Sequence, residues 1–312
     1  MTTWALVLMA ALLVVGGLIG FSVAAARRIE EIVPPQGGFL DLDGERIHIL
    51  DKGAGRPVVL IHGLEGQMGN FTHSLVDRLA GEFRVVAFDR PGSGYSTRSA
   101  KSPAGVRAQA ATLARVIRAI KLERPVIVGH SLGGAVALAI ALDEPDCASA
   151  LALIAPLTQP VAIPPLVFRG LAIRSLFIRR FVAWTLATPA SLLARDLALK
   201  QVFAPEPVPA DFATAGGGLL GLRPRNVYAA SSDMVATNDD LEEMTPRYAS
   251  IRIPIGILYG RGDRILDWRA QGESLKQKVP SVDLEIVDGG HMLPVTQPDI
   301  VAGFIRRMAV QC

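Results

Sequence analysis

Residues 125–142 read Pro-Val-Ile-Val-Gly-His-Ser-Leu-Gly-Gly-Ala-Val-Ala-Leu-Ala-Ile-Ala-Leu. A short apolar run ends at Gly129 and an alanine-rich helical pattern begins at Leu132, so Ser131 is predicted on a tight turn between a strand and a helix. Small residues two positions to either side leave room for such a turn. The turn exposes the Ser131 hydroxyl at the start of the helix. For Ser131 alone, the alternative is a helix-capping serine between packing glycines.

The alternation of strand and helix extends to both sides of this stretch. Short apolar runs are typical of strands buried on both faces of a parallel sheet, and helical patterns lie between them at residues 104–120 and 132–142. The pattern predicts a mostly parallel α/β sheet covered by helices on both faces. Residues 38–42 and 46–50 instead flank Asp43-Gly44 and predict a hairpin. The predicted parallel strands are residues 57–61, 84–88, 125–128, 151–154, 254–258 and 282–287.

The alternation stops between residues 157 and 247, where prolines interrupt helix-like apolar segments and no clean strand pattern is found. Because the rhythm of strand and helix resumes at Ile253, we interpret this region as a helical cap inserted between two core strands. The predicted organisation is an anchor at residues 1–26, a linker at 27–37, a core at 38–156 and 248–312, and the cap at 157–247.

The N-terminal segment, residues 1–26, contains no charged side chain. As a helix, residues 4–26 would span about 34 Å, enough for a hydrocarbon core ~30 Å thick. We therefore predict a single-pass membrane helix. A cleaved signal peptide is the alternative, because residues 23–26 offer small side chains for cleavage. Arg27 and Arg28 follow the apolar run and favour a cytoplasmic position for the globular body.

The overall composition excludes several classes of protein. The chain has 312 residues, of which 50% are hydrophobic and 20% charged, so it is neither a disordered nor a fibrous protein. The 32 Lys and Arg residues against 29 Asp and Glu give a net charge of +3, too small an excess to predict nucleic-acid binding. Cys147 and Cys312 match no metal-binding spacing and form at most one disulfide. We therefore predict no metal site and no disulfide scaffold.

A serine hydroxyl becomes a good nucleophile when a base takes its proton, so a histidine and an orienting carboxylate are expected at later strand ends. Asp263 and His291 follow the last two predicted strands. We predict that Ser131 is the nucleophile, His291 the base and Asp263 the acid that orients it. Asp267 and Asp288 are the alternative acids.

A tetrahedral intermediate also needs two N–H donors for its oxyanion. We predict that they are the backbone N–H groups of Leu64 and Leu132, with His62 bracing the loop that carries Leu64. Glu65 lies next to the first donor, where an ionised carboxylate would oppose the oxyanion. We expect Glu65 to face solvent, and the alternative is that it selects a cationic or hydroxyl-bearing substrate group. The three other histidines are interpreted as structural: His48, His73 and His130.

Taken together, these motifs resemble the α/β-hydrolase fold family over about residues 38–309. The resemblance is to the capped branch that holds esterases, carbon-carbon bond hydrolases, epoxide hydrolases, haloalkane dehalogenases and cofactor-free haloperoxidases. The epoxide hydrolase and dehalogenase members carry an aspartate nucleophile, so Ser131 implies acyl transfer to water or to another acceptor. The resemblance rests on His62-Gly63, residues 88–96, residues 129–134, residues 260–263 and Gly290-His291.

The predicted function is a membrane-anchored serine hydrolase that cleaves a carboxylic ester with an apolar acyl chain and needs no metal or organic cofactor. Its predicted partners are a small-molecule ester and, through the N-terminal helix, a lipid bilayer. Phe168, Phe177 and Trp184 of the cap are predicted to line the acyl site. A further hypothesis is that two short cap helices present Arg179 and Arg180 to lipid headgroups. The alternatives are a carbon-carbon bond hydrolase or perhydrolase with the same triad, and a catalytically silent binding protein.

Overall fold

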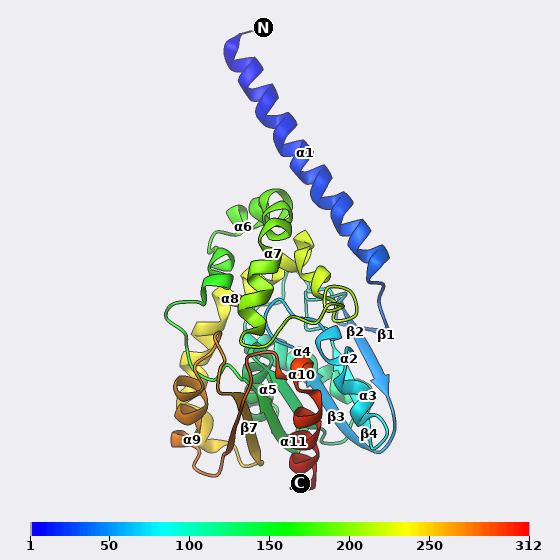
Figure 1. The fold of residues 1–312 in the computed structure, drawn as a ribbon, viewed down its shortest axis with the longest axis vertical. Helices are drawn as coiled ribbons and strands as arrows, with labels where there is room; N and C mark the ends of the chain where they lie inside the picture. The colour runs from blue at the N-terminus through cyan, green and yellow to red at the C-terminus, as the bar shows by residue number, and fades with distance from the viewer. Residues whose placement is uncertain (1, 312) are drawn as a thin grey trace.

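The computed structural model describes residues 2–311, whose centre is an eight-stranded sheet (Figure 1). The strand order is β1-β2-β4-β3-β5-β6-β7-β8, with antiparallel pairing of β2 to β1 and β4 and parallel pairing elsewhere. The predicted mostly parallel α/β sheet is confirmed. The strands are β1 (Gly38–Leu42), β2 (Glu45–Lys52), β3 (Arg56–Ile61), β4 (Phe83–Phe88), β5 (Val126–His130), β6 (Ala150–Ile154), β7 (Ile255–Gly260) and β8 (Asp283–Val287).

Two strand boundaries show how local sequence shapes the sheet. Asp43 and Gly44 connect β1 to β2 with φ values of 50° and 81°, as expected of a two-residue hairpin turn that needs two positive φ angles. β5 runs two residues further than predicted, because His130 pairs with Ile154 of β6. This extension carries the strand up to Ser131.

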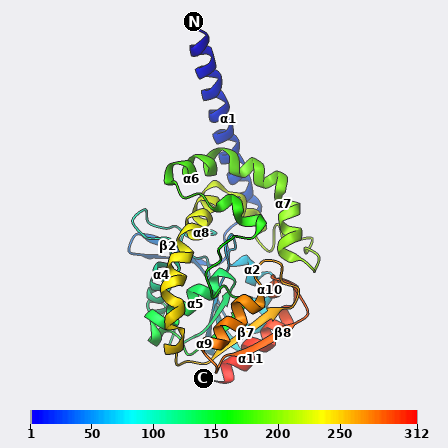
Figure 2. The same ribbon diagram turned by 90° about the vertical axis from the view of Figure 1, so that its left-hand side faces the viewer.

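Helices cover both faces of the sheet, as predicted (Figure 2). On one face lie α4 (Val106–Ala119) and α5 (Leu132–Asp143), and on the other α3 (Leu75–Leu79) and α11 (Pro298–Val310). Residues 132–141 of α5 are all buried, because this helix packs between the sheet and its neighbour α4. The remaining helices of the core are α2 (Gly69–Thr72), η1 (Pro145–Cys147), η6 (Arg269–Glu273), α9 (Ser274–Lys278) and α10 (Leu293–Thr296).

The segment between β6 and β7 is helical and carries no strand in the structure, as the interrupted pattern of residues 157–247 predicts. Figures 1 and 2 place it on the side of the sheet from which the N-terminal helix projects. Its helices are η2 (Leu166–Leu171), α6 (Leu176–Val182), η3 (Ala183–Ala187), α7 (Thr188–Phe203), η4 (Gly218–Leu222), α8 (Pro224–Met244) and η5 (Thr245–Ser250).

The N-terminal helix α1 (Thr3–Ile32) projects away from the body (Figures 1 and 2). By length and composition it can cross a membrane, and only 6% of its most apolar window is buried. The helix continues beyond the apolar run, so the linker predicted at residues 27–37 begins too early. The reason is tertiary: Ile29 is buried against the cap, and Glu30 pairs with Arg223 at 2.6 Å.

Candidate active site

Ser131 lies between β5 and α5 with φ 54° and ψ −121°. Residues with a side chain rarely adopt positive φ, and this strained turn presents the hydroxyl outward. A Cβ atom added to Gly129 would lie 2.5 Å from the carbonyl oxygen of Gly133, and one added to Gly133 would lie 2.1 Å from the carbonyl oxygen of Ile61. Close approach of the backbone therefore requires both glycines of the motif.

The loops after β7 and β8 bring Asp263 and His291 together. Nδ1 of His291 lies 2.7 Å from Oδ2 of Asp263, and the two side chains are 4% and 0% exposed. Oδ1 of Asp263 accepts hydrogen bonds from the N–H groups of Ile265 and Leu266 at 2.7 and 3.0 Å. Because Asp263 occupies Nδ1, Nε2 is the nitrogen of His291 that is left to exchange a proton. His291 and Ser131 line the same cavity.

The two alternative acids lie in other environments. Asp267 accepts hydrogen bonds from the first two N–H groups of the short helix η6 (Arg269–Glu273), at 2.7 and 3.0 Å. The side chain of Asp288 is 99% exposed. Of the three candidates, the structure pairs Asp263 with His291.

The loop after β3 passes directly over Ser131. A Cβ atom added to Gly63 would lie 2.8 Å from Cβ and 3.3 Å from Oγ of Ser131. Leu64 follows Gly63, and Leu132 follows Ser131, and both leucines line a cavity that also contains Ser131. The two backbone segments predicted to supply the oxyanion donors thus border Ser131.

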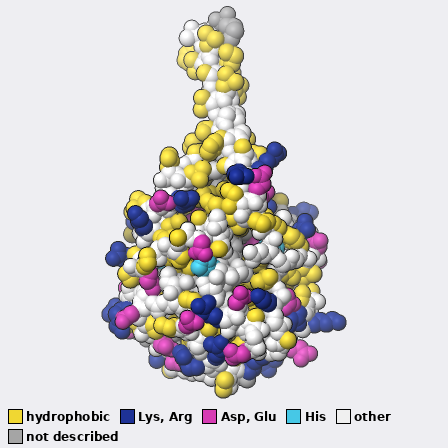
Figure 3. Space-filling view, turned by 45° about the vertical axis from the view of Figure 1, so that its right-hand side comes forward, with side chains coloured by type: hydrophobic (Ala, Val, Ile, Leu, Met, Phe, Trp, Pro, Cys, Tyr) yellow, Lys and Arg dark blue, Asp and Glu magenta, His cyan; other side chains and the backbone are white. Residues whose placement is uncertain are grey.

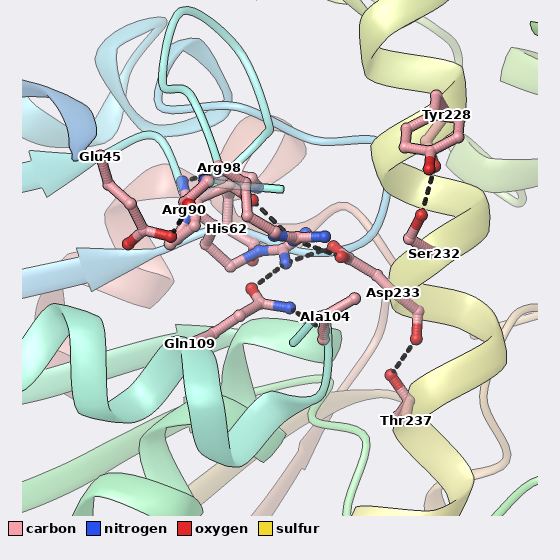
Figure 4. A network of polar contacts seen from close by, with 12 residues as sticks. Glu45, His62, Arg90, Arg98, Ala104, Gln109, Tyr228, Ser232, Asp233 and Thr237 are labelled. Atoms are coloured by element: carbon pink, nitrogen blue, oxygen red, sulfur yellow. Dashed lines mark hydrogen bonds and ion pairs between the residues drawn. The ribbon is translucent and has the colours of Figure 1, made fainter. Parts of the chain in front are cut away.

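A buried hydrogen-bond network holds this loop in place (Figure 4). Nε2 of His62 accepts from the backbone N–H of Arg90 at 2.9 Å, so Nδ1 carries the proton and donates to the carbonyl oxygen of Gly63 at 2.8 Å. Burial, together with the Arg90 charge, lowers the pKa of His62 to about 3. The ring is therefore neutral, and its position fits the predicted bracing role.

The Arg90 guanidinium connects the same loop to the cap. It donates to the carbonyl oxygens of His62 and Gly63, both at 2.9 Å, and pairs with Asp233 of α8 at 2.8 Å. The C=O and N–H of one trans peptide group point in opposite directions. Holding the Gly63 carbonyl therefore also fixes the direction of the Leu64 N–H.

Sequence reasoning did not assign a role to this ion pair. Arg90 lies within residues 88–96, the stretch that carries part of the family resemblance, so that motif marks it as a residue to test. Asp233 has no comparable signal, because it stands 143 residues from Arg90 along the chain and follows no motif.

Two cavities meet at Ser131. The larger has a volume of about 410 Å³ and extends from His291 under α7 and η3 of the cap. The smaller has a volume of about 260 Å³ and extends past Leu132. Leu64, Ser131 and Phe168 line both cavities, so Phe168 lies beside Ser131 and its role at an acyl site stays a prediction. Most of the other lining side chains are apolar, which suits an apolar substrate.

Glu65 is exposed, as expected of a side chain that faces solvent, and it lines the larger cavity. Desolvation by the surrounding protein raises the pKa of its carboxyl to about 7. Glu65 also has φ 54°. This conformation costs a residue with a Cβ roughly 1–2 kcal/mol, and such strain is concentrated at functional sites.

Two cap residues predicted at the acyl site lie elsewhere, because α6 and η3 turn these side chains away from the two cavities. Phe177 is 81% exposed on α6, and Trp184 packs edge-on against Tyr228 with ring centres 5.9 Å apart. Neither is among the described residues that line the two cavities. Arg179 is buried and donates to Ser232 at 3.0 Å, so its predicted contact with lipid headgroups is also wrong.

The remaining histidines have contacts of their own. His130 places Nε2 2.9 Å from the carbonyl oxygen of His291, and the two rings are 5.0 Å apart. Burial and the neighbouring His291 lower the pKa of His130 to about 3, so the ring is neutral and supports the loop of His291. His48 and His73 hydrogen-bond other carboxylates. Neither of these two is among the described residues that line the cavities at Ser131.

The strand order and the turn after β5 can be compared with known proteins. A family model described as the alpha/beta hydrolase fold matches residues 56–298. The chain belongs to the alpha/beta hydrolase fold family. It is therefore a hydrolase of this fold, in agreement with the resemblance in the sequence. Among residues 2–311 of this hydrolase, no group of three or more His, Cys, Asp or Glu side chains is arranged to hold a metal ion.

Three individual matches to this hydrolase differ in sequence identity and in the share of the chain that they cover. It is 40% identical over 120 residues to the dihydrolipoyllysine-residue acetyltransferase component of the acetoin cleaving system of Cupriavidus necator, a match that covers 38% of this chain and 31% of that one. The structure of a thermophilic esterase from Thermogutta terrifontis is 22% identical, with a TM-score of 0.71 over 88% of this chain and 98% of that one. A membrane phospholipase A is 23% identical, with a TM-score of 0.66 over 99% and 98%. These two structures share the fold.

Proposed function

We propose that this protein is a membrane-anchored serine hydrolase that cleaves a carboxylic ester through an acyl-enzyme on Ser131. The observation that carries the proposal is the Asp263–His291 hydrogen bond of 2.7 Å at a mostly apolar cavity that also exposes Ser131. Asp263 orients the ring of His291 and stabilises its protonated form. The N–H groups of Leu64 and Leu132 are the proposed oxyanion donors.

The proposed reaction has two halves. His291 takes the proton of the Ser131 hydroxyl while Oγ attacks the ester carbonyl carbon, and the negative charge moves to the carbonyl oxygen. The intermediate collapses, the bond to the leaving oxygen breaks, and His291 gives that oxygen the proton. Water then attacks the acyl-enzyme and passes a proton to His291. The acid is released, and the proton returns to Ser131.

The position of α1 supports an ester that partitions into membranes. The side chain of Ser22 on α1 donates to the carbonyl oxygen of Thr185 in η3, so the proposed anchor contacts the cap above the larger cavity. Figure 3 shows hydrophobic side chains that continue from the projecting helix onto the adjoining part of the body. The exposed large apolar residues of α6, η3 and α7 are Leu176, Phe177, Ile178, Phe181, Leu186, Leu192, Leu193 and Leu197.

The likeness in fold to a membrane phospholipase A over almost the whole of both chains adds support for a lipid ester. Tethering raises the local concentration of membrane-partitioned molecules at the site. Arg27 and Arg28 at the end of the apolar run favour a cytoplasmic position for the body.

The proposal predicts that activity rises with the length of the acyl chain. Each buried methylene contributes about 0.8 kcal/mol, so kcat/KM should rise from acetate towards octanoate and then level off when the cavity is full. The measurement uses p-nitrophenyl esters of rising chain length with the full-length protein in detergent, below the concentration at which the substrates aggregate. A flat or falling profile would contradict an apolar acyl site.

The reaction class is tested on the same preparation. A fluorophosphonate probe should label wild-type protein and leave Ser131→Ala unlabelled, because labelling needs an activated serine. Absence of labelling in wild-type protein would favour a binding protein. Turnover of a diketone in the absence of ester turnover would favour a carbon-carbon bond hydrolase.

A further inference from the structure

The two cavities at Ser131 differ in which catalytic groups they contain. His291 lines the larger cavity and is not among the described residues that line the smaller one. Leu132, a proposed oxyanion donor, lines the smaller cavity and not the larger. Leu64 and Ser131 lie at the junction, where the carbonyl carbon of an ester must sit for attack by Oγ.

This asymmetry assigns the two halves of an ester. The leaving oxygen has to lie within hydrogen-bond reach of His291, because it takes the proton from that ring. The alcohol half therefore belongs in the cavity of about 410 Å³. The acyl chain extends the other way, past Leu132, into the cavity of about 260 Å³.

The alcohol cavity contains one carboxyl group without a partner. None of the hydrogen bonds or ion pairs of the described residues involves the side chain of Glu65. The cations that line the same cavity are engaged elsewhere: Arg179 donates to Ile173 and to a serine of α8, and Arg195 pairs with its neighbour in sequence. A carboxyl group that no protein donor occupies is free to accept a hydrogen bond from a ligand in the cavity, and such charge-assisted bonds are stronger than bonds between neutral groups.

We propose that Glu65 determines specificity by binding a hydrogen-bond donor, a hydroxyl or an ammonium group, on the leaving alcohol of the ester. The inference rests on the proposed function and adds the chemical class of the alcohol. The position of Glu65, next in sequence to the proposed oxyanion donor Leu64, places it near the ester bond. The pKa of Glu65, raised to about 7 by burial alone, agrees with a carboxyl group that no protein cation stabilises.

The test compares three octanoate esters that share one acyl chain and differ in the alcohol: 1-octanoylglycerol, 2-(dimethylamino)ethyl octanoate, whose amine is protonated at neutral pH and carries an N–H, and propyl octanoate. Full-length wild type, Glu65→Gln and Glu65→Leu are measured in detergent, with Glu123→Gln as a control for loss of an exposed carboxylate. For wild type, we expect kcat/KM for at least one of the two donor-bearing esters to be about tenfold or more above kcat/KM for propyl octanoate. The reason is that a site built to bind a hydroxyl discriminates strongly against a substrate that lacks it. Glu65→Leu should remove that preference and leave propyl octanoate within about threefold.

The variants also separate the two kinds of donor. A preference for the glycerol ester that partly survives in Glu65→Gln identifies a hydroxyl, which a neutral amide can still bind. A preference for the 2-(dimethylamino)ethyl ester that is lost in Glu65→Gln identifies an ammonium group. Equal wild-type rates on all three esters, or an equal loss on all three in Glu65→Leu, would overturn the inference while leaving Ser131-dependent hydrolysis intact. Failure of the proposed function would instead appear as no Ser131-dependent turnover of any ester.

Discussion

Ser131 and Glu65 have the same positive φ of 54°, and both border the larger cavity. For Ser131 the strained turn aims the hydroxyl away from the sheet. For Glu65 it places a carboxyl group inside the cavity. A glycine at position 65 would adopt this φ without strain, so the presence of glutamate accords with a role for its side chain.

At the residue scale, the identity of the catalytic acid is directly testable. Asp263→Asn should lower kcat by about 10³- to 10⁴-fold, because the asparagine no longer holds the required tautomer of His291. Asp267→Asn should stay within about threefold of wild type, because Asp267 caps η6. Steady-state ester hydrolysis, with thermal unfolding to check the fold, measures both variants. Near-full activity of Asp263→Asn with loss in Asp267→Asn would reverse the assignment.

The raised pKa of Glu65 predicts a pH-dependent stability. Burial raises this pKa from 4.5 to about 7, so between these values the unfolded chain releases a proton that the folded chain keeps. Stability contributed by Glu65 therefore falls as pH rises from about 4.5 to about 7 and changes no further above that. The comparison is between wild type and Glu65→Gln. This substitution leaves the other charged or titratable groups that line the cavity unchanged, namely His291, Arg179 and Arg195.

The check is the difference in Tm between wild type and Glu65→Gln, measured from pH 5 to pH 8. Wild type should lose stability relative to Glu65→Gln up to about pH 7, and the difference should then stay constant. A difference that is the same at every pH would show that Glu65 has an ordinary pKa.

At the scale of elements, a buried ion pair connects the cap to the loop that carries Leu64. Arg90 donates to the carbonyl oxygen of Gly63 in that loop, and it also pairs with Asp233 of α8 (Figure 4). Movement of α8 would therefore disturb the peptide group that presents the Leu64 N–H. The site depends on the cap for geometry as well as for a substrate cavity.

Asp233→Asn should lower kcat about tenfold and leave KM within about twofold of wild type. Removal of an oxyanion donor lowers kcat by about 10²- to 10³-fold, and loosening one donor should cause part of that loss. The control is Arg107→Gln, which breaks a different contact with α8, the 2.8 Å pair with Glu243. Both variants are measured by ester kinetics normalised to folded protein. Equal effects of the two variants on kcat would indicate a general loosening of the cap and not a role at the loop.

At the scale of the whole molecule, α1 and the cap lie on the same side of the sheet (Figures 1 and 2). Residues near the C-terminal end of α1 pack on the cap through Ile29 and Glu30, while most of the helix stays free of the body. A retained anchor would hold the cap and its exposed apolar residues towards the bilayer. Cleavage near Ala26 would remove the apolar segment of α1 and leave the C-terminal turns of this helix, which pack on the cap.

We predict that the anchor is retained. The full-length protein should stay in the membrane fraction after a carbonate wash, since a helix of this length and apolarity inserts stably. Mass spectrometry of the same fraction should find the N-terminus before residue 23. A soluble protein with a mature N-terminus near Ala26 would establish a signal peptide.

The sequence by itself determined the features that depend on neighbouring residues. The apolar runs predicted the sheet, because strands buried on both faces have to be apolar along their length. Asp43-Gly44 predicted the hairpin, and the glycines around Ser131 predicted a turn in which backbone segments nearly touch. The chain order of Ser131, Asp263 and His291 at strand ends was sufficient to name the candidate triad.

Only the tertiary structure decided which distant groups meet. It paired Asp263 rather than Asp267 with His291, placed Glu65 at a cavity, exposed Phe177, and joined Arg90 to Asp233. The first outcome depends on how two loops of the core meet, and the other three depend on how the cap packs on the core. Arg90 and Asp233 are 143 residues apart, and such a contact leaves no periodic pattern in the sequence of either segment. Local patterns therefore predict elements and turns, whereas the burial and pairing of single charged side chains follow from the assembled fold.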